Sequence, residues 1–132
     1  MNEDQMLVMV VEDEELLLKA IEIKLEKSGK KVIACISAGE AMTALKSKPR
    51  LPDIIWLDYY LKDMNGLQFV SMLKANPEWA NIPVIVVSNS ASTDKVSQML
   101  ALGVNKYYLK AESRLEDLVD MLEEITSGKG GA

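Results

Sequence analysis

Five polar residues that could support chemistry stand at the ends of apolar runs of this sequence. Glu12 and Asp13 follow the first run and Asp58 follows the third, while Ser88 and Lys110 follow the fourth and fifth. If these runs are parallel strands of one sheet, their carboxyl ends lie at a common edge, and the five side chains meet there. Crowded carboxylates repel one another unless a cation lies among them. The sequence therefore predicts a site for a hard divalent cation.

The residue types at this edge also suit phosphoryl transfer. Mg²⁺ binds one or two carboxylates, a carbonyl and waters, and leaves positions for phosphate oxygens, whereas Ca²⁺ prefers a fuller oxygen cage. Mg²⁺ is therefore the expected ion, with Mn²⁺ as the alternative. An Asp can act as a nucleophile that forms an aspartyl phosphate, and Asp58 is the best placed. Lys110 and Ser88 would stabilise charge on the phosphoryl oxygens.

The apolar runs that position these residues alternate with segments of helical periodicity. Alternation of this kind favours a parallel sheet with helices on both faces, because right-handed crossovers place them there. The expected fold is α/β, a doubly wound, flavodoxin-like parallel sheet of five strands in the order 2-1-3-4-5, with its ligand site where the strand order reverses. The expected strands are 6–11, 31–36, 53–57, 82–87 and 104–109, and the expected helices are 16–25, 39–48, 67–75, 94–102 and 115–125.

The composition restricts the classes of function open to the chain. Its 132 residues are the size of one domain, and its net charge of −5 disfavours nucleic acid as a direct partner. Cys35 is the only cysteine and there is no histidine, which excludes an internal disulfide and the usual zinc sites. No apolar run approaches the ~18 residues that a membrane span needs. We therefore expect a protein of the reducing cytoplasm, with no membrane partner.

Four motifs, in order and at matching spacing, carry a resemblance to a known family. They are V-V-E-D at 10–13, I-I-W-L-D at 54–58 with M-N-G at 64–66, V-V-S at 86–88 and G-V-N-K-Y-Y-L-K at 103–110. Through them the chain resembles the receiver domain of two-component response regulators from Gln5 to about Thr126. The resemblance implies a receiver domain over residues 1–127, followed by a flexible C-terminal tail at 128–132.

The resemblance also implies a role for each site residue. Asp58 would be the phosphoacceptor, and Glu12 and Asp13 would hold Mg²⁺ together with Asp58 and the backbone carbonyl of Tyr60. Ser88 and Tyr107 would form a switch pair. In the family the hydroxyl moves toward the new phosphoryl oxygens, the aromatic ring turns inward, and the face made by the fourth helix, the fifth strand and the fifth helix is remodelled.

The sequence departs from the family pattern around the pocket. Ala111 stands where the family usually has Pro after a cis bond. A cis bond before Ala would cost roughly 2.5–4 kcal/mol, so we expect a trans Lys110–Ala111 bond, the alternative being a strained local structure that leaves the position of Lys110 less well defined. Tyr59, Tyr60 and Asn89 also differ from the common residues, and Lys62 replaces a common Pro. These side chains flank the pocket, where we expect them to slow the entry of water or to change which small donors enter.

A second apolar stripe on the first helix does not follow from the core pattern. Leu16, Ala20 and Ile23 lie more than ~120° around the helix from the core-facing stripe, so we expect them to be exposed. We interpret this stripe as a docking surface for the helices of a donor kinase or phosphotransfer protein. The alternative is an apolar helix face without a partner.

Three classes of function compete for this pattern. The leading prediction is a stand-alone phosphoacceptor switch, a signalling module rather than an enzyme with a separate substrate. It would receive its phosphoryl group from a histidine kinase or phosphotransfer protein and control an unknown downstream protein. A phosphatase with an aspartyl intermediate would need an acid at position 60, which is Tyr60. A flavodoxin-like cofactor binder would need a phosphate-binding loop where the acidic residues 12–15 stand.

Overall fold

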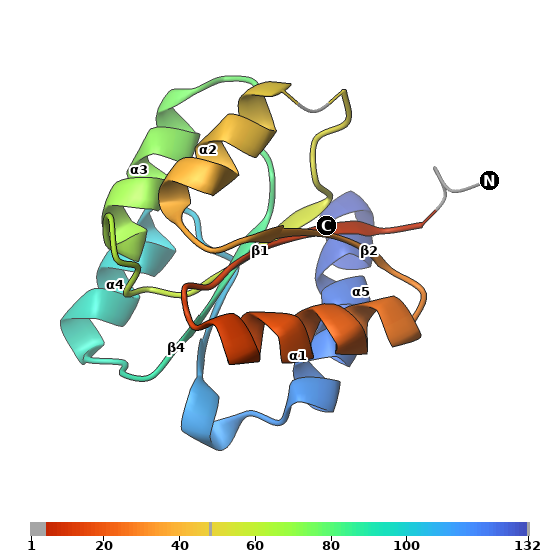
Figure 1. The fold of residues 1–132 in the computed structure, drawn as a ribbon. Coiled ribbons are helices and arrows are strands. Elements are labelled where there is room, and N and C mark those ends of the chain that lie inside the picture. The colour runs from red at the N-terminus through yellow and green to blue at the C-terminus, as the bar shows by residue number, and fades with distance from the viewer. Residues whose placement is uncertain (1–4, 48, 132) are drawn as a thin grey trace.

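The computed structural model describes residues 5–47 and 49–131, with side chains up to Thr126. Its centre is a parallel sheet of five strands in the predicted order, β2-β1-β3-β4-β5 (Figure 1). The strands are β1 (Leu7–Val11), β2 (Lys31–Cys35), β3 (Ile54–Leu57), β4 (Val84–Ser88) and β5 (Lys106–Leu109). The helices are α1 (Glu15–Lys27), α2 (Ala38–Ser47), α3 (Gly66–Ala75), α4 (Thr93–Ala101) and α5 (Leu115–Gly131), with a 3₁₀ turn η2 (Lys110–Glu112).

Two hydrophobic clusters fill the space between the sheet and its helices. Successive residues of a strand point to opposite faces, so Val8 and Val10 pack under α1 and α5, while Met9 and Val11 pack under α2, α3 and α4. Both faces of the central strands are therefore buried, which explains their uninterrupted apolar sequences. No helix within the described residues is long and apolar enough to cross a membrane.

Most element ends differ from the sequence prediction by one or two residues, and the end of α5 differs by more. Strand β4 begins at Val84 rather than at residue 82 and includes Ser88 as its last residue. Strand β5 begins at Lys106 rather than at residue 104, because the Asn105 side chain accepts the Val84 N–H at 3.0 Å just before it. Helix α5 continues to Gly131, beyond the expected end at 125. The division of the chain at residue 127 stays a prediction, and residue 132 lies outside the described residues.

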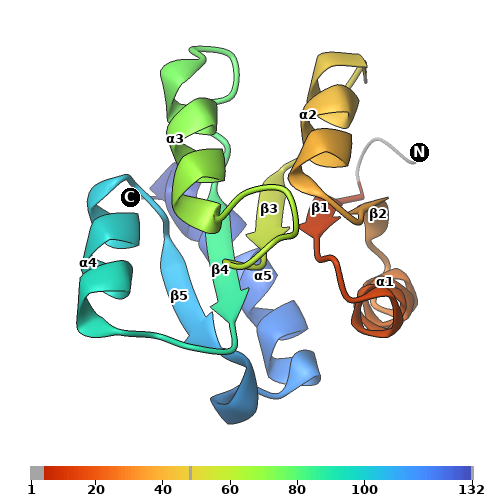
Figure 2. The ribbon, with the colours of Figure 1, turned by 60° about the vertical axis from the view of Figure 1, so that its left-hand side comes forward.

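The loops that carry the candidate site leave the carboxyl ends of adjacent strands. Figure 2 shows β3, β4 and β5 running side by side toward this edge. Two hydrogen bonds continue the strand pairing into the loops. The Glu12 N–H donates to the Cys35 carbonyl at 3.0 Å, and the Asp58 N–H donates to the Val11 carbonyl at 3.0 Å. These bonds fix the backbone of the first residue of each loop against the neighbouring strand.

Candidate functional site

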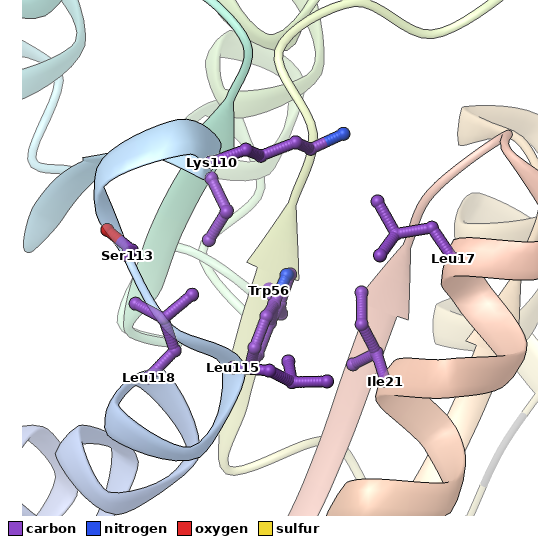
Figure 3. Close-up of a pocket in the computed structure, with 8 residues that line it drawn as sticks. Leu17, Ile21, Trp56, Lys110, Ser113, Leu115 and Leu118 are labelled. Carbon is purple, nitrogen blue, oxygen red and sulfur yellow. The ribbon is translucent and has the colours of Figure 1, made fainter.

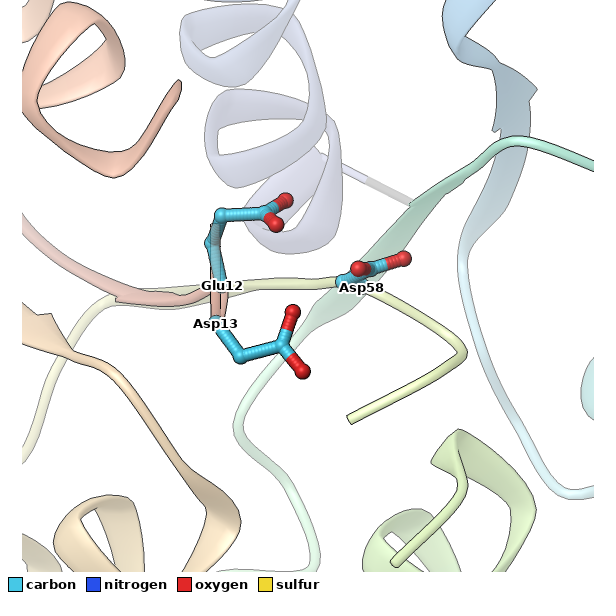
Figure 4. Close-up of side chains that lie close together, drawn as sticks. All are labelled: Glu12, Asp13 and Asp58. Carbon is cyan, nitrogen blue, oxygen red and sulfur yellow. The ribbon is translucent and has the colours of Figure 1, made fainter. Parts of the chain in front are cut away.

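Three carboxylates meet between the ends of β1 and β3 (Figure 4). Glu12, Asp13 and Asp58 each place one carboxylate oxygen within 4.8 Å of the other two. Glu12 is 1% exposed and Asp58 is 6% exposed, so little water screens their charges. One oxygen of Glu12 accepts the Glu14 N–H at 3.1 Å, which fixes the orientation of that side chain. The structure therefore brings together the acids that the sequence placed at one edge.

Lys110 supplies a positive charge to this acidic cluster. Its Nζ atom lies 3.0 Å from an oxygen of Glu12 and 3.6 Å from an oxygen of Asp58. Burial lowers the pKa of Lys110, but the hydrogen bond to Glu12 and the charges of Asp58 and Glu12 outweigh it, so the net pKa is raised. The ammonium therefore stays protonated beside Asp58.

The peptide bond that follows Lys110 has the conformation expected before Ala111 rather than before a proline. No cis peptide bond occurs within the described part of the chain, so the Lys110–Ala111 bond is trans, as Ala111 predicted. The chain turns through η2 directly after β5. Lys110 still reaches Asp58 from the first residue of this turn, so a trans bond is compatible with the expected position of its ammonium.

One ammonium does not balance the negative charge of the cluster. Burial raises the pKa of Asp58, the Glu12 charge raises it further, and the Lys110 charge lowers it, which leaves a net pKa of about 6. The cluster thus holds an excess of negative charge contributed by hard oxygen donors. Carboxylate oxygens at this spacing are the donors that Mg²⁺ prefers. The residues present therefore fit a hard divalent cation.

Ser88 and Tyr107 lie on the neighbouring strands β4 and β5. Ser88 is fully buried, and its hydroxyl accepts the Ser90 N–H at 3.4 Å. The Tyr107 hydroxyl donates to the Ser90 carbonyl at 2.7 Å, and burial raises the pKa of Tyr107. Tyr107 packs with the cluster under α4, whereas Tyr108 packs with the cluster under α5. Both members of the predicted pair thus contact the loop that joins β4 to α4.

Sequence reasoning missed a set of contacts beside this loop. The Lys95 ammonium, on the first turn of α4, donates to the Tyr60 hydroxyl and lies 3.4 Å from the Ser90 hydroxyl. It also lies 5.0 Å from the centre of the Tyr59 ring and 4.5 Å from that of the Tyr60 ring. The hydrogen bond lowers the pKa of Tyr60 and raises that of Lys95. No motif marks Lys95, so only the fold could reveal this contact.

The loop between β3 and α3 has two further attachments that sequence reasoning missed. The Asp63 carboxylate accepts the N–H groups of Ala38 and Gly39, at 3.1 and 2.8 Å, and thereby caps α2. Gly66 packs so closely that a Cβ atom there would lie 3.2 Å from the Tyr59 Cα. The M-N-G motif is the only sequence signal of this approach, and its Gly66 is the residue that the packing requires.

The predicted docking stripe is exposed on α1. Leu16 is 87% exposed, Ile23 is 42% exposed, and Ala20 is also exposed. Beside it, an apolar pocket of about 130 Å³ opens between α1 and the start of α5 (Figure 3). Its lining includes Leu17 and Trp56, together with the aliphatic stem of Lys110. Trp56 is therefore a core residue of the α1 and α5 face.

Comparison with known proteins gives one consistent family. The profile of the response regulator receiver domain matches residues 8–123. The transcriptional regulatory protein KdpE of Mycobacterium tuberculosis is 37% identical over 105 residues, which cover 79% of this chain and 44% of KdpE. The chain therefore spans less than half the length of that relative.

Solved structures agree in fold. A receiver domain protein from Methanospirillum hungatei matches with a TM-score of 0.86 at 20% identity, over 97% of this chain and 98% of the other. The phosphorylated cyanobacterial phytochrome response regulator RcpA is 27% identical and matches with a TM-score of 0.78, over 92% of this chain and 91% of the other. The first structure, at 20% identity, supports the fold alone. The second shows the same fold at the higher identity of 27%.

Proposed function

The chain belongs to the response regulator receiver domain family, and from this membership we propose that it accepts a phosphoryl group on Asp58 from a histidine kinase or phosphotransfer protein. The observation that carries the proposal is the position of Asp58, buried between two other acids and in contact with the Lys110 ammonium. The phosphorylated state of the similar regulator RcpA supports the same chemistry. The chain's own reactions would be its phosphorylation and dephosphorylation, without a separate substrate.

In the proposed transfer, an oxygen of the Asp58 carboxylate attacks the phosphorus atom of the donor. A new O–P bond forms, and the bond from phosphorus to the donor atom breaks with its electron pair left on the donor. The pKa of Asp58, about 6, leaves most of this carboxylate ionised at neutral pH, as a nucleophile must be. The Lys110 ammonium then neutralises charge on the phosphoryl oxygens as a compact point charge.

The acidic cluster would hold Mg²⁺ during this reaction. Asp13 and Asp58 would be direct carboxylate ligands, with the backbone carbonyl of Tyr60 as a third ligand. Glu12 would contribute charge from its buried position, where its two oxygens already face Lys110 and the Glu14 N–H. When bound, the ion supplies positive charge that permits an anionic donor to approach the acids.

We assign Ser88 and Tyr107 to the response that follows phosphorylation. The Ser88 hydroxyl would turn to the new phosphoryl oxygens, and the Tyr107 ring would move into the space beside it. The two residues share the Ser90 backbone as a hydrogen-bond partner, which supports their coupling. The change would remodel the face formed by α4, β5 and α5, where a downstream protein would bind.

The exposed stripe on α1 would receive the phosphoryl donor. Leu16, Ala20 and Ile23 form an apolar surface that continues through Leu17 into the pocket floored by Trp56. A donor's helices could bury this surface while presenting a phosphohistidine to Asp58. We propose that this encounter occurs in the cytoplasm, with no nucleic acid or membrane as a direct partner of the chain.

Docking at α1 can be separated from the chemistry at Asp58. We expect the double change Leu16→Ser and Ile23→Ser to slow transfer from the cognate phosphodonor protein, because the buried apolar area is lost. Phosphorylation by acetyl phosphate should keep its rate, since that donor needs no docking surface. Radiolabel transfer from both donors measures the two rates, and an equal loss with both donors would contradict the assignment.

Intact mass spectrometry tests the proposed function directly. After incubation with acetyl phosphate and Mg²⁺, the wild-type chain should gain the mass of one phosphoryl group, and Asp58→Ala should gain none. An equal gain in the variant would place the acceptor elsewhere. No gain in either protein, each checked for native folding by circular dichroism, would refute the assignment of the chain as a phosphoacceptor.

A further inference from the structure

The pocket between α1 and the start of α5 is apolar and has the size of a small molecule (Figure 3). Its volume is about 130 Å³, and Trp56 forms its floor. Its aliphatic walls are Leu17, Ile21, Val87, Leu115 and Leu118. In another protein, an apolar cavity of roughly 150 Å³ stays free of water and binds benzene. This pocket can therefore hold a molecule of about six heavy atoms.

Trp56 brings a polar group to this apolar lining. It is 2% exposed, and its indole N–H has no hydrogen-bond acceptor within the described residues. The Tyr108 hydroxyl is the one fully enclosed side-chain group without a partner in that part of the chain, so the indole N–H is not fully enclosed and opens to the pocket. Figure 3 shows its nitrogen at the end of the ring toward Lys110. The pocket thus presents a free hydrogen-bond donor.

Water and anions are poor occupants of this pocket. A buried water molecule usually makes about three hydrogen bonds, and the aliphatic walls offer it none. The Ser113 hydroxyl points away from Trp56 (Figure 3). An anion is disfavoured because Glu12 already holds the Lys110 ammonium at 3.0 Å, with further carboxylates beside it. The lining therefore selects a neutral molecule with a hydrocarbon body.

We propose that this pocket binds a small neutral molecule that is apolar apart from one hydrogen-bond acceptor, such as a cyclic ketone. Burial of its hydrocarbon part drives binding, and its oxygen accepts the Trp56 indole N–H. The aliphatic stem of Lys110 also lines the pocket, and its ammonium lies 3.6 Å from an oxygen of Asp58. A bound molecule therefore contacts the same side chain that reaches Asp58.

A nuclear magnetic resonance titration of the unphosphorylated chain tests this site with cyclopentanone as the probe. The two tryptophans give two indole N–H signals, which Trp56→Phe assigns. Cyclopentanone should move the Trp56 signal downfield until the site is saturated, because its carbonyl accepts the N–H. Trp79, buried on the opposite face of the sheet, should keep its signal in place. Methylenecyclopentane, which has the same shape without the oxygen, should shift the methyl signals of the pocket leucines but not move the indole signal downfield.

Substitutions locate the binding in the pocket. Leu17→Phe and Leu115→Phe fill the space from α1 and from α5, and each should abolish the shifts. Leu67→Phe, at a similarly half-buried leucine of α3 on the opposite face of the sheet, should bind cyclopentanone as wild type does. Trp56→Phe keeps an aromatic floor without a donor, so it should weaken cyclopentanone binding roughly two- to tenfold, the usual contribution of one neutral hydrogen bond.

Three outcomes would overturn the proposed ligand site: equal shifts of both indole signals, binding that persists in both Leu17→Phe and Leu115→Phe, or no shift with either probe. In the last case, slower phosphotransfer from the donor protein to Leu115→Phe, with a normal acetyl phosphate reaction, would assign the pocket to a donor side chain instead. A phosphoryl mass gain on Asp58 needs no ligand in this pocket, so loss of the ligand site would leave the proposed function standing.

Discussion

At the scale of single residues, the charge of Asp58 dominates the site. Two other carboxylates lie beside it, and one ammonium offsets only part of their repulsion. In metal-free protein, burial and this repulsion together raise the pKa of Asp58 from 3.8 to about 6. The same repulsion is what a divalent cation would relieve, so the energetic cost of bringing these carboxylates together and their affinity for a metal have one origin.

Burial of Asp58 and this repulsion give the stability of the metal-free protein a definite dependence on pH. Because the folded pKa of Asp58 is raised from 3.8 to about 6, its contribution to stability is present at low pH and is lost as pH rises through 6. Asp58→Asn should therefore melt at a higher temperature than wild type at pH 7.5 with a chelator present. The difference should shrink as pH falls toward 4. A difference that does not vary with pH would contradict a raised pKa for Asp58 in the folded protein.

Gly66 shows how closely a residue outside the acidic cluster is constrained. A Cβ atom there would lie 3.2 Å from the Tyr59 Cα and 3.3 Å from a Tyr59 ring carbon. We expect Gly66→Ala to lower the free energy of unfolding by roughly 1–3 kcal/mol, because backbone must shift to admit the methyl group. Urea denaturation measures the change.

Gly39→Ala is the matched control for that measurement. Gly39 also lies in the first turn of a helix, but its added Cβ would meet nothing closer than a carboxylate oxygen of Asp63 at 3.4 Å. This variant should be as stable as wild type or slightly more stable, since Ala favours helix over Gly. Equal losses in the two variants would show that crowding at Tyr59 is not the cause.

At the scale of elements, the loop from β3 to α3 is attached to helices on both of its sides. Asp63 caps α2, and Tyr60 contacts Lys95 of α4. The loop that carries the proposed Tyr60 ligand thus connects to elements well beyond the pocket. Its position is set by these contacts and by the capping box at Asn65 that begins α3.

The cap on α2 can be tested by truncation. Asp63→Ala should lower the free energy of unfolding by about 1 kcal/mol, the usual value for a lost N-cap, because the N–H groups of Ala38 and Gly39 lose their acceptor. Asp63→Asn keeps one acceptor oxygen and should lose less. Urea denaturation at neutral pH provides both values. Equal stability of wild type and Asp63→Ala would show that water replaces the cap without cost.

At the scale of the whole molecule, the sequence was sufficient to predict the fold and the main acidic site. Strands such as β1 are covered by helices on both faces, so their apolar runs are long, and each run ends where a polar residue enters the loop. The convergence of Glu12, Asp13, Asp58 and Lys110 then followed from strand order alone. The element ends were harder to predict, because the Asn105 side chain replaces strand pairing just before β5.

The contacts that the sequence could not reveal share a physical cause. Lys95 and Tyr60 are separated by 35 positions, and Asp63 and Ala38 by 25. Each pair joins two loops or helix ends through long or flexible side chains, for which no periodic pattern exists. Their meeting depends on the exact direction in which each loop leaves the sheet, and that direction emerges only from the packed structure.

The most direct test of the central claim is a calorimetric titration of Mg²⁺ into the protein. The proposed site predicts one bound ion per chain in wild type and loss of that binding in Asp13→Asn, while Glu15→Gln, which removes an exposed acid outside the cluster, should bind as wild type does. Circular dichroism would confirm that each variant is folded. Binding that is absent from wild type, or that persists unchanged in Asp13→Asn, would contradict a divalent-cation site at the acidic cluster.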